Sequence, residues 1–108
     1  MKFDHIAIKG NNINETVDWY RENLEANILY QDETWALAKV SNIKVAFVLE
    51  DQHPPHLCFE IGKDKKEELK ISHSEFKYHR DGSEYIYIKD NNDNTIEFLY
   101  WPEVKNVN

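Results

Sequence analysis

Three landmarks in the first half of this 108-residue chain have counterparts in the second half at almost one spacing. The pairs are His5 with His56 at 51 positions, Asn12 with Asp64 at 52, and Phe47 with Phe98 at 51. A shared offset over three landmarks indicates an architecture that is built twice, although the halves have little sequence identity. The chain is therefore predicted to be one domain, 1–108, with residues 1–50 and 55–101 as its two modules.

The two halves also share the order of their predicted elements. Alternating apolar residues indicate strands, and apolar residues three and four apart indicate helices. The first half reads as a strand over 3–8, a helix over 12–26 and strands over 27–31, 34–40 and 44–50. The second half reads as a strand over 55–61, a helix over 62–70 and strands over 75–79, 84–90 and 95–101. This order predicts an α+β fold of two tandem βαβββ modules.

Both helices have a polar residue where a helix start is expected. Asn12 is followed three positions later by Glu15, and Asp64 is followed three positions later by Glu67, a spacing typical of capping boxes. We therefore predict that Asn12 and Asp64 are the N-caps. The apolar stripe of the first helix is predicted to contain Ile13, Val17, Tyr20 and Leu24.

Strand parity places three metal-binding residue types on corresponding faces. Side chains two positions apart on a strand point the same way, so His5 lies opposite Ile6 and Ile8. By the same rule His56 and Glu97 lie opposite the apolar residues of their own strands. If the apolar faces contact the helices, the other faces carry two imidazoles and a carboxylate. This is a ligand set for a divalent first-row metal ion.

Two nearby residues with metal-binding side chains lie too far along the chain to bind the same ion. His53 is three residues from His56, with opposite parity and roughly 10 Å away along an extended chain. Glu50 lies four residues beyond Ala46, the first-module counterpart of Glu97, which is roughly 13 Å along a strand. The predicted site therefore has three protein ligands, with an alanine at the fourth symmetric position.

Three segments resemble motifs of the vicinal oxygen chelate superfamily, which includes glyoxalase I, fosfomycin-resistance thiol transferases, methylmalonyl-CoA epimerase, extradiol dioxygenases and bleomycin-resistance proteins. The segments are FDHIAI (3–8), PHLCFEI (55–61) and IKDNNDNTIEFLYW (88–101). The resemblance implies that His5, His56 and Glu97 are the metal ligands. It also implies a curled mixed sheet around a cavity, with the modules paired within one chain or exchanged in a homodimer.

The resemblance has departures. Asn91 and Asp93 stand where the family usually has Pro and Gly in its closing turn, although both residue types tolerate turns. Ala46 lacks the additional ligand that glyoxalase I and the epimerase generally use. This favours similarity to three-ligand members such as the thiol transferases and dioxygenases.

These features predict a metal-dependent enzyme that acts on a small oxygen-rich substrate. The ion would be Fe, Mn, Zn, Ni or Co, since two histidines and a carboxylate accept several metals. The alternative is a metal-free protein of the bleomycin-resistance type, in which an acidic dimer sequesters a cationic small molecule between aromatic walls. A third possibility is a stand-alone regulatory or assembly domain that retains only the fold.

Further residues have a functional and a structural interpretation. Glu60 is a candidate general base or an exposed acid, and Cys58 is a small buried residue or a ligand. Arg80 is a candidate contact for an anionic substrate or a solvated loop residue, while His73 and His79 are expected to titrate on the surface without partners. Four aromatic residues are candidate cavity walls or ordinary core residues: Trp35, Tyr85, Tyr87 and Trp101.

Charge and hydropathy limit the classes of partner that the chain is expected to bind. The chain has 13 basic and 20 acidic residues, a net charge of −7, and lacks a basic cluster for binding nucleic acid. It contains no apolar run of membrane-spanning length and no signal-like segment, so we expect a soluble cytoplasmic protein that binds no membrane. A single cysteine excludes an intramolecular disulfide.

Overall fold

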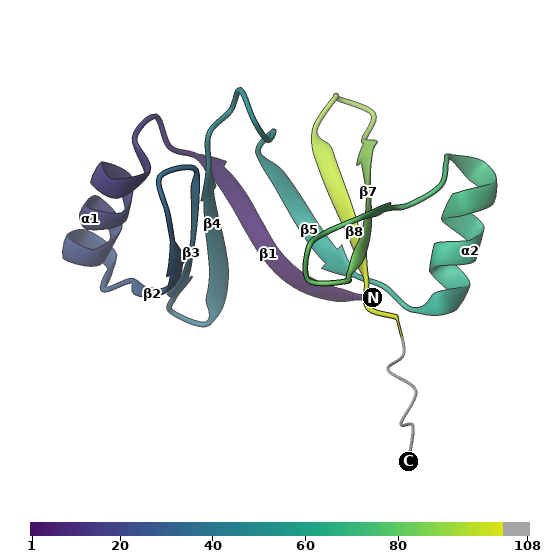
Figure 1. Ribbon diagram of the computed structural model, residues 1–108, viewed down its shortest axis with the longest axis horizontal. Helices are drawn as coiled ribbons and strands as arrows, with labels where there is room; N and C mark the ends of the chain where they lie inside the picture. The colour runs from purple at the N-terminus through teal and green to yellow at the C-terminus, as the bar shows by residue number, and fades with distance from the viewer. Residues whose placement is uncertain (103–108) are drawn as a thin grey trace, which may run out of the picture. The chain divides into compact units, whose positions relative to one another are not determined.

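The computed structural model of the chain describes residues 1–102 (Figure 1). Its strands and helices are, in order, β1 (Lys2–Lys9), α1 (Ile13–Leu24), β2 (Asn27–Gln31), β3 (Trp35–Val40), β4 (Ile43–Val48), β5 (His56–Glu60), α2 (Lys63–Ser72), β6 (Lys77–Tyr78), β7 (Glu84–Lys89) and β8 (Thr95–Tyr100). A strand, a helix and three strands occur twice, which confirms the predicted α+β fold of two βαβββ modules. The curling of the sheet around a cavity stays a prediction.

The chain divides into two compact units whose boundaries cross the modules. The first unit is Asp4–Cys58, and the second begins at Phe59 and also includes Met1–Phe3. Within the second unit the rings of Phe3 and Phe59 form an edge contact, with centroids 5.7 Å apart. Each unit therefore contains the beginning of a strand from the other module.

The first unit is built on a mixed sheet with the strand order β2-β3-β4-β1. β1 is parallel to β4, with Ala7 opposite Ala46, while the remaining neighbours are antiparallel. The helix α1 packs on one face, where Ile6 and Ile8 contact its core as their parity predicts. The buried residues of this core are Ile13, Val17, Ala26, Ala36, Ala38, Val45 and Phe47.

The opposite face of this sheet has a separate small cluster. Ala7, Ala46 and Val48 are buried there and Leu37 packs against them. Because His5 is two residues from Ala7 on β1, it emerges on this face and away from the helix. The predicted parity thus places His5 on the face of the sheet that α1 does not cover.

The ends of α1 have clear local causes. The Asn12 side chain accepts a hydrogen bond from the Glu15 amide at 3.1 Å, so the predicted N-cap is confirmed. The helix ends at Glu25, which has a left-handed backbone with φ of 54°. Leu24 is 46% exposed, so its predicted place in the apolar stripe is wrong, because it lies at the last turn beyond the core.

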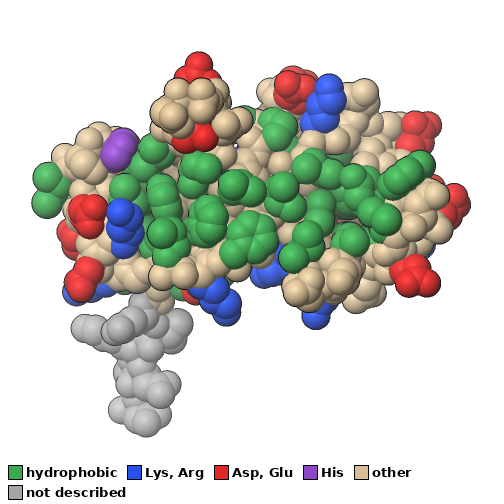
Figure 2. All heavy atoms as spheres, turned by 180° about the vertical axis from the view of Figure 1, so that it is seen from behind, with side chains coloured by type: hydrophobic (Ala, Val, Ile, Leu, Met, Phe, Trp, Pro, Cys, Tyr) green, Lys and Arg blue, Asp and Glu red, His purple; other side chains and the backbone are tan. Residues whose placement is uncertain are grey.

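Large apolar side chains also reach the surface of the first unit. Figure 2 shows this unit on its right-hand side, where hydrophobic side chains gather and acidic side chains stand at the margin. The exposed large apolar residues in this unit include Trp19, Leu24, Leu29, Tyr30, Trp35, Ile43 and Leu57.

The second unit has the strand order β8-β7-β6, with each neighbouring pair antiparallel. Its core contains Ile61, Leu69, Phe76 and Ile86, against which Ile88, Phe98 and Tyr100 pack. The predicted strand over 75–79 shortens to two residues, and Phe76 is buried in the core before it begins.

The predicted N-cap of α2 is wrong. The cap is Gly62, in an extended conformation and without a side-chain hydrogen bond, and Asp64 lies inside the first turn. A carboxylate is favourable anywhere in this turn because it faces the positive end of the helix dipole. Its spacing from Glu67 therefore does not define the cap.

A buried ion pair joins α2 to the sheet of the second unit. Lys66 Nζ lies 2.8 Å from Glu84 Oε1, and the two side chains are only 15% and 9% exposed. Lys66 Nζ also lies 4.6 Å from the centroid of the Tyr100 ring. The hydrogen bond to Glu84 raises the pKa of Lys66, against the opposing effect of burial.

Among the described residues, no helix has both the length and the apolar character needed to cross a membrane.

Candidate metal centre

The first unit brings two histidines of the predicted ligand set together. The imidazole rings of His5 on β1 and His56 on β5 have centroids 5.4 Å apart and meet edge to face at 72°. His56 is buried, with 8% of its surface exposed, and His5 is half-buried. Two imidazoles at this separation can direct nitrogen atoms toward one ion.

Both rings have the same nitrogen engaged by an oxygen acceptor. His5 Nδ1 lies 2.6 Å from Asp4 Oδ2, and His56 Nδ1 lies 2.8 Å from the carbonyl oxygen of Pro54. A neutral imidazole that donates from Nδ1 carries its lone pair on Nε2. Histidine ligands in metalloproteins usually have this arrangement, in which one ring nitrogen binds the ion and the other donates to an oxygen.

Asp4 is itself held in place. Its Oδ1 accepts a hydrogen bond from Lys44 Nζ at 3.2 Å while Oδ2 contacts His5. The hydrogen bond with His5 is the largest influence on the pKa of Asp4, which is lowered by this bond and by Lys44 despite partial burial. A charged Asp4 is therefore available to orient the His5 ring.

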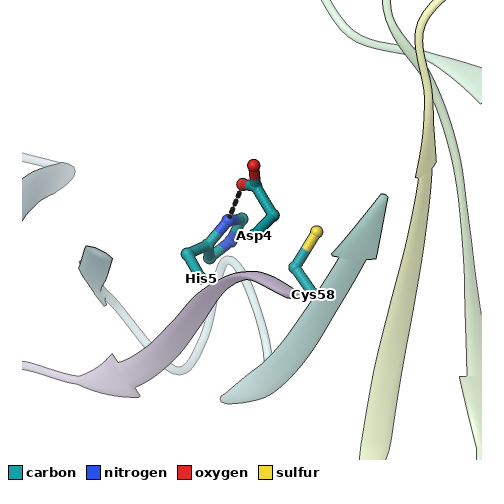
Figure 3. Close-up of side chains that lie close together, drawn as sticks. All are labelled: Asp4, His5 and Cys58. Atoms are coloured by element: carbon teal, nitrogen blue, oxygen red, sulfur yellow. Dashed lines mark hydrogen bonds and ion pairs between the residues drawn. The ribbon is translucent and has the colours of Figure 1, made fainter. Parts of the chain in front are cut away.

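Cys58 lies beside Asp4 and His5, and these three residues form a group of possible metal-donor atoms. Donor atoms of Asp4, His5 and Cys58 all lie within 4.8 Å of one another, and Figure 3 shows the three side chains close together. Cys58 is fully buried. Because the hydrogen bond in Figure 3 engages His5 Nδ1, the geometry favours Asp4 as an orienting group rather than a ligand. The ligand role of Cys58 stays a prediction.

Glu97 belongs to the second unit, where it is buried on β8 with 3% of its surface exposed. His79 Nε2 lies 2.9 Å from Glu97 Oε2. The expectation that His79 is a surface residue without a partner is therefore wrong. Sequence reasoning missed it because the pairing depends on the sheet register, although the turn signal HRDGS (79–83) marked the hairpin that joins β6 to β7.

The aromatic residues of β7 share the face of Glu97. Tyr87 is directly opposite Glu97 in the sheet register, and Tyr85 follows on the same side. The two tyrosine rings meet edge to face at 5.4 Å, and His79 stacks on Tyr85 at 3.9 Å with an interplanar angle of 14°. Tyr87 thus lies opposite a buried carboxylate rather than in an apolar core, with Tyr85 beside it.

The other predicted site residues have different surroundings. Trp35, on β3 of the first unit, stacks on Tyr30 at 4.4 Å and is 36% exposed. Trp101 is 46% exposed, Arg80 lies exposed in the turn after β6, and Glu60 is half-buried at the end of β5. Their roles with a substrate or in catalysis stay predictions.

Comparison with known proteins identifies the architecture. No protein-family profile and no curated protein sequence matches the chain. Solved structures do match over nearly its full length. A hypothetical protein from Bacillus halodurans C-125 is 14% identical, with a TM-score of 0.74 over 98% of both chains. Methylmalonyl-CoA epimerase from Mycobacterium tuberculosis is 16% identical, with a TM-score of 0.72 over 96% of this chain and 89% of that one.

A third match carries the family description. A glyoxalase/bleomycin resistance/dioxygenase superfamily member from Vibrio splendidus 12B01 is 9% identical, with a TM-score of 0.68 over 89% of this chain and 95% of that one. The chain has the glyoxalase-like fold. At these identities the similarity extends to the fold alone.

Within the glyoxalase-like fold, the donor atoms found here suit a divalent first-row ion. His5 and His56 offer imidazole nitrogens whose orientation is set by hydrogen bonds at Nδ1. Glu97 offers a buried carboxylate with a hydrogen bond from a neighbouring imidazole. Neutral imidazole and carboxylate are ligands for zinc, iron, manganese, cobalt and nickel.

Proposed function

We propose that this protein is a divalent-metal-dependent enzyme of the vicinal oxygen chelate type. Its substrate is a small molecule with adjacent oxygen atoms. The observation that carries the proposal is the His5 and His56 pair, with rings 5.4 Å apart and each Nδ1 engaged by an oxygen.

Glu97 is proposed as the third ligand. It lies 41 residues after His56, on the strand that corresponds to β4 by the 51-residue offset. The offset assigns Ala46 as its first-module counterpart, and Ala46 is buried against Ala7 and Val48. A methyl group offers no donor atom, so the proposed site has three protein ligands and open positions for substrate.

The chain's own residues have separate tasks in this proposal. The Asp4 carboxylate and the Pro54 carbonyl orient the two imidazoles, while Tyr85 and Tyr87 offer hydroxyl groups to a polar substrate. When bound, the metal ion would supply Lewis-acid polarisation of a substrate oxygen. Glu60 is proposed as the general base, since a half-buried carboxylate can accept a proton.

Metal analysis of tag-free protein tests the proposal. Wild type is expected to bind about one divalent ion per chain, and His56→Ala is expected to lose it because an imidazole ligand is removed. His53→Ala is the matched control, since His53 is exposed and lies in the same short segment. Equal and negligible metal in wild type and His56→Ala would overturn the proposal.

Thermal unfolding gives an independent reading. An ion at one hundred times its dissociation constant stabilises the folded state by about 2.7 kcal/mol. For a chain of this size that corresponds to a shift in midpoint of about 10 °C or more. Chelator is therefore expected to lower the midpoint of wild type and His53→Ala, and to leave His56→Ala unchanged.

A metal-free binding protein of the bleomycin-resistance type is the second candidate. The net charge of −7 and the exposed stack of Tyr30 on Trp35 favour it. Asp32 lies beside this stack, and hydrogen bonds from Tyr30 and Thr34 lower its pKa, so a fixed negative charge adjoins the aromatic surface. Binding of aromatic cations that is abolished by Trp35→Ala and insensitive to chelator would favour this candidate.

The homodimer and the cytoplasmic location expected from the sequence stay predictions, as does the choice among the five metals.

A further inference from the structure

A buried carboxylate and a neighbouring histidine form a defined pair in the second unit. The Glu97 side chain is 4% exposed, and His79 Nε2 lies 2.9 Å from its Oε2. Burying a carboxylate is costly unless hydrogen bonds or charges compensate it. The hydrogen bond to His79 therefore compensates part of the cost of burying the Glu97 carboxylate, although 18 residues separate the two in the sequence.

His79 is held from two further directions. Its ring stacks on Tyr85 at 3.9 Å, which fixes the plane from which Nε2 projects. Its backbone amide donates to the carbonyl of Ser83 at 2.9 Å, which closes the turn between β6 and β7. The stack and the turn thus fix both the plane and the position of the imidazole.

The turn that anchors His79 is itself well defined. Asp81 Oδ1 accepts hydrogen bonds from the amide of Ser83 at 2.9 Å and from its hydroxyl at 2.6 Å. Gly82 has a φ of 90°, a conformation that side-chain-bearing residues rarely adopt. The turn, the stack and the hydrogen bond together place the imidazole against one oxygen of Glu97.

We propose that His79 is a positioning residue for the metal centre. Its hydrogen bond to Oε2 fixes the orientation of the Glu97 carboxylate that would hold the ion. Removing a residue that hydrogen-bonds to a metal ligand typically changes metal affinity by 10–100-fold. The inference rests on the proposed function, because it takes Glu97 as a ligand.

The alternative is a purely structural pair that compensates the buried charge. The two readings differ in what a substitution changes. A structural pair alters the stability of the metal-free protein, with no selective effect on metal binding. A positioning residue alters the metal dissociation constant, and a residue that restores the hydrogen bond rescues it.

Three variants separate these readings. His79→Phe keeps a ring to stack on Tyr85 and removes the donor, while His79→Gln keeps a donor of similar reach. His73→Phe is the matched control, because His73 is an exposed histidine at the end of α2. Zinc and cobalt dissociation constants are measured by competition with a chromophoric chelator, and the unfolding of each metal-free variant is followed by circular dichroism.

The expected result is a selective loss of affinity. His79→Phe binds both ions about 10–100-fold more weakly than wild type, and His79→Gln restores most of the loss. His73→Phe binds like wild type. An unchanged dissociation constant in His79→Phe, or equal losses in His79→Phe and His79→Gln, would overturn the inference.

Failure of the proposed function has a different signature. If wild type itself binds neither ion, the metal centre and the role of His79 are both refuted. If wild type binds an ion, His56→Ala loses it and His79→Phe does not weaken it, the centre stands and only the role of His79 falls. Should His79→Phe fail to fold without metal, His79→Ala replaces it as the variant without a donor, and the same comparison of its dissociation constants with those of His79→Gln decides.

Discussion

Replacement of Lys66 by methionine should strongly destabilise the second unit. The substitution keeps an unbranched apolar side chain beside Tyr100 and removes the ammonium group 2.8 Å from Glu84. At this distance the attraction is roughly 6 kcal/mol for an effective dielectric constant of about 20, before the cost of desolvation is subtracted. Removing one partner of a buried pair costs about 3–5 kcal/mol, and exposed pairs are worth about 0.2–1 kcal/mol.

The small exposures of Lys66 and Glu84, 15% and 9%, place their pair near the buried class. We therefore expect Lys66→Met to lower the free energy of unfolding by about 3 kcal/mol at neutral pH. Urea unfolding followed by circular dichroism measures this difference. The matched control is Lys65→Met, whose partner Glu68 is 67% exposed and which should cost less than about 0.5 kcal/mol.

The pH dependence provides a separate check. The pKa of Lys66 is raised above its ordinary value of 10.5 by the hydrogen bond to Glu84. The stabilisation is therefore fully present below pH 10.5 and is lost as the pH rises through the raised pKa. The effect of Lys66→Met should be equal at pH 7 and pH 9. Equal costs for Lys66→Met and Lys65→Met would refute the reasoning.

Two further substitutions test local geometry. Asp4→Asn leaves a neutral acceptor beside His5 Nδ1, so the metal affinity should fall by about tenfold. The free energy of unfolding of the metal-free protein should change little. An unchanged affinity in a zinc competition titration would argue against the orienting role of Asp4. Gly82→Ala should cost about 1 kcal/mol in urea unfolding because φ is 90°, whereas Gly62→Ala, at φ of −89° with open space around it, should change the value by less than about 0.5 kcal/mol. Equal effects at the two glycines would contradict the explanation from backbone strain.

Local patterns were sufficient for the order of the elements. A short strand-like run before the turn signal QDE located β2 at residues 27–31, and the offset of 51 residues anticipated the repeat. The side chain of Asn12 caps α1 as expected, because N-capping depends on residues three positions apart. Parity also separated Ile6 and Ile8 from His5 correctly, since one strand determines both faces.

Features that depend on register or on backbone groups could not be predicted. The pairing of His79 with Glu97 follows from the alignment of β6 with β7 and of β7 with β8, which no local pattern contains. The hydrogen bond from His56 to Pro54 uses a main-chain carbonyl, so the residue type of Pro54 gave no sign of it. Asp64 misled the assignment of the α2 start because an acidic residue suits several positions in a first turn.

The exchange of strand beginnings between the two units has a consequence for synthesis on the ribosome. The first unit ends at Cys58, so it is incomplete when only the first module, residues 1–50, has emerged. Likewise, Phe3 and its partner Phe59 are separated by 56 positions, so the second unit combines residues of both modules. Contacts at such separation are formed slowly, because a long loop must close first. The duplicated halves therefore cannot fold one after the other as independent copies. A chain cut between residues 50 and 55 should yield two fragments with whole strands, each without a strand segment that its compact unit includes.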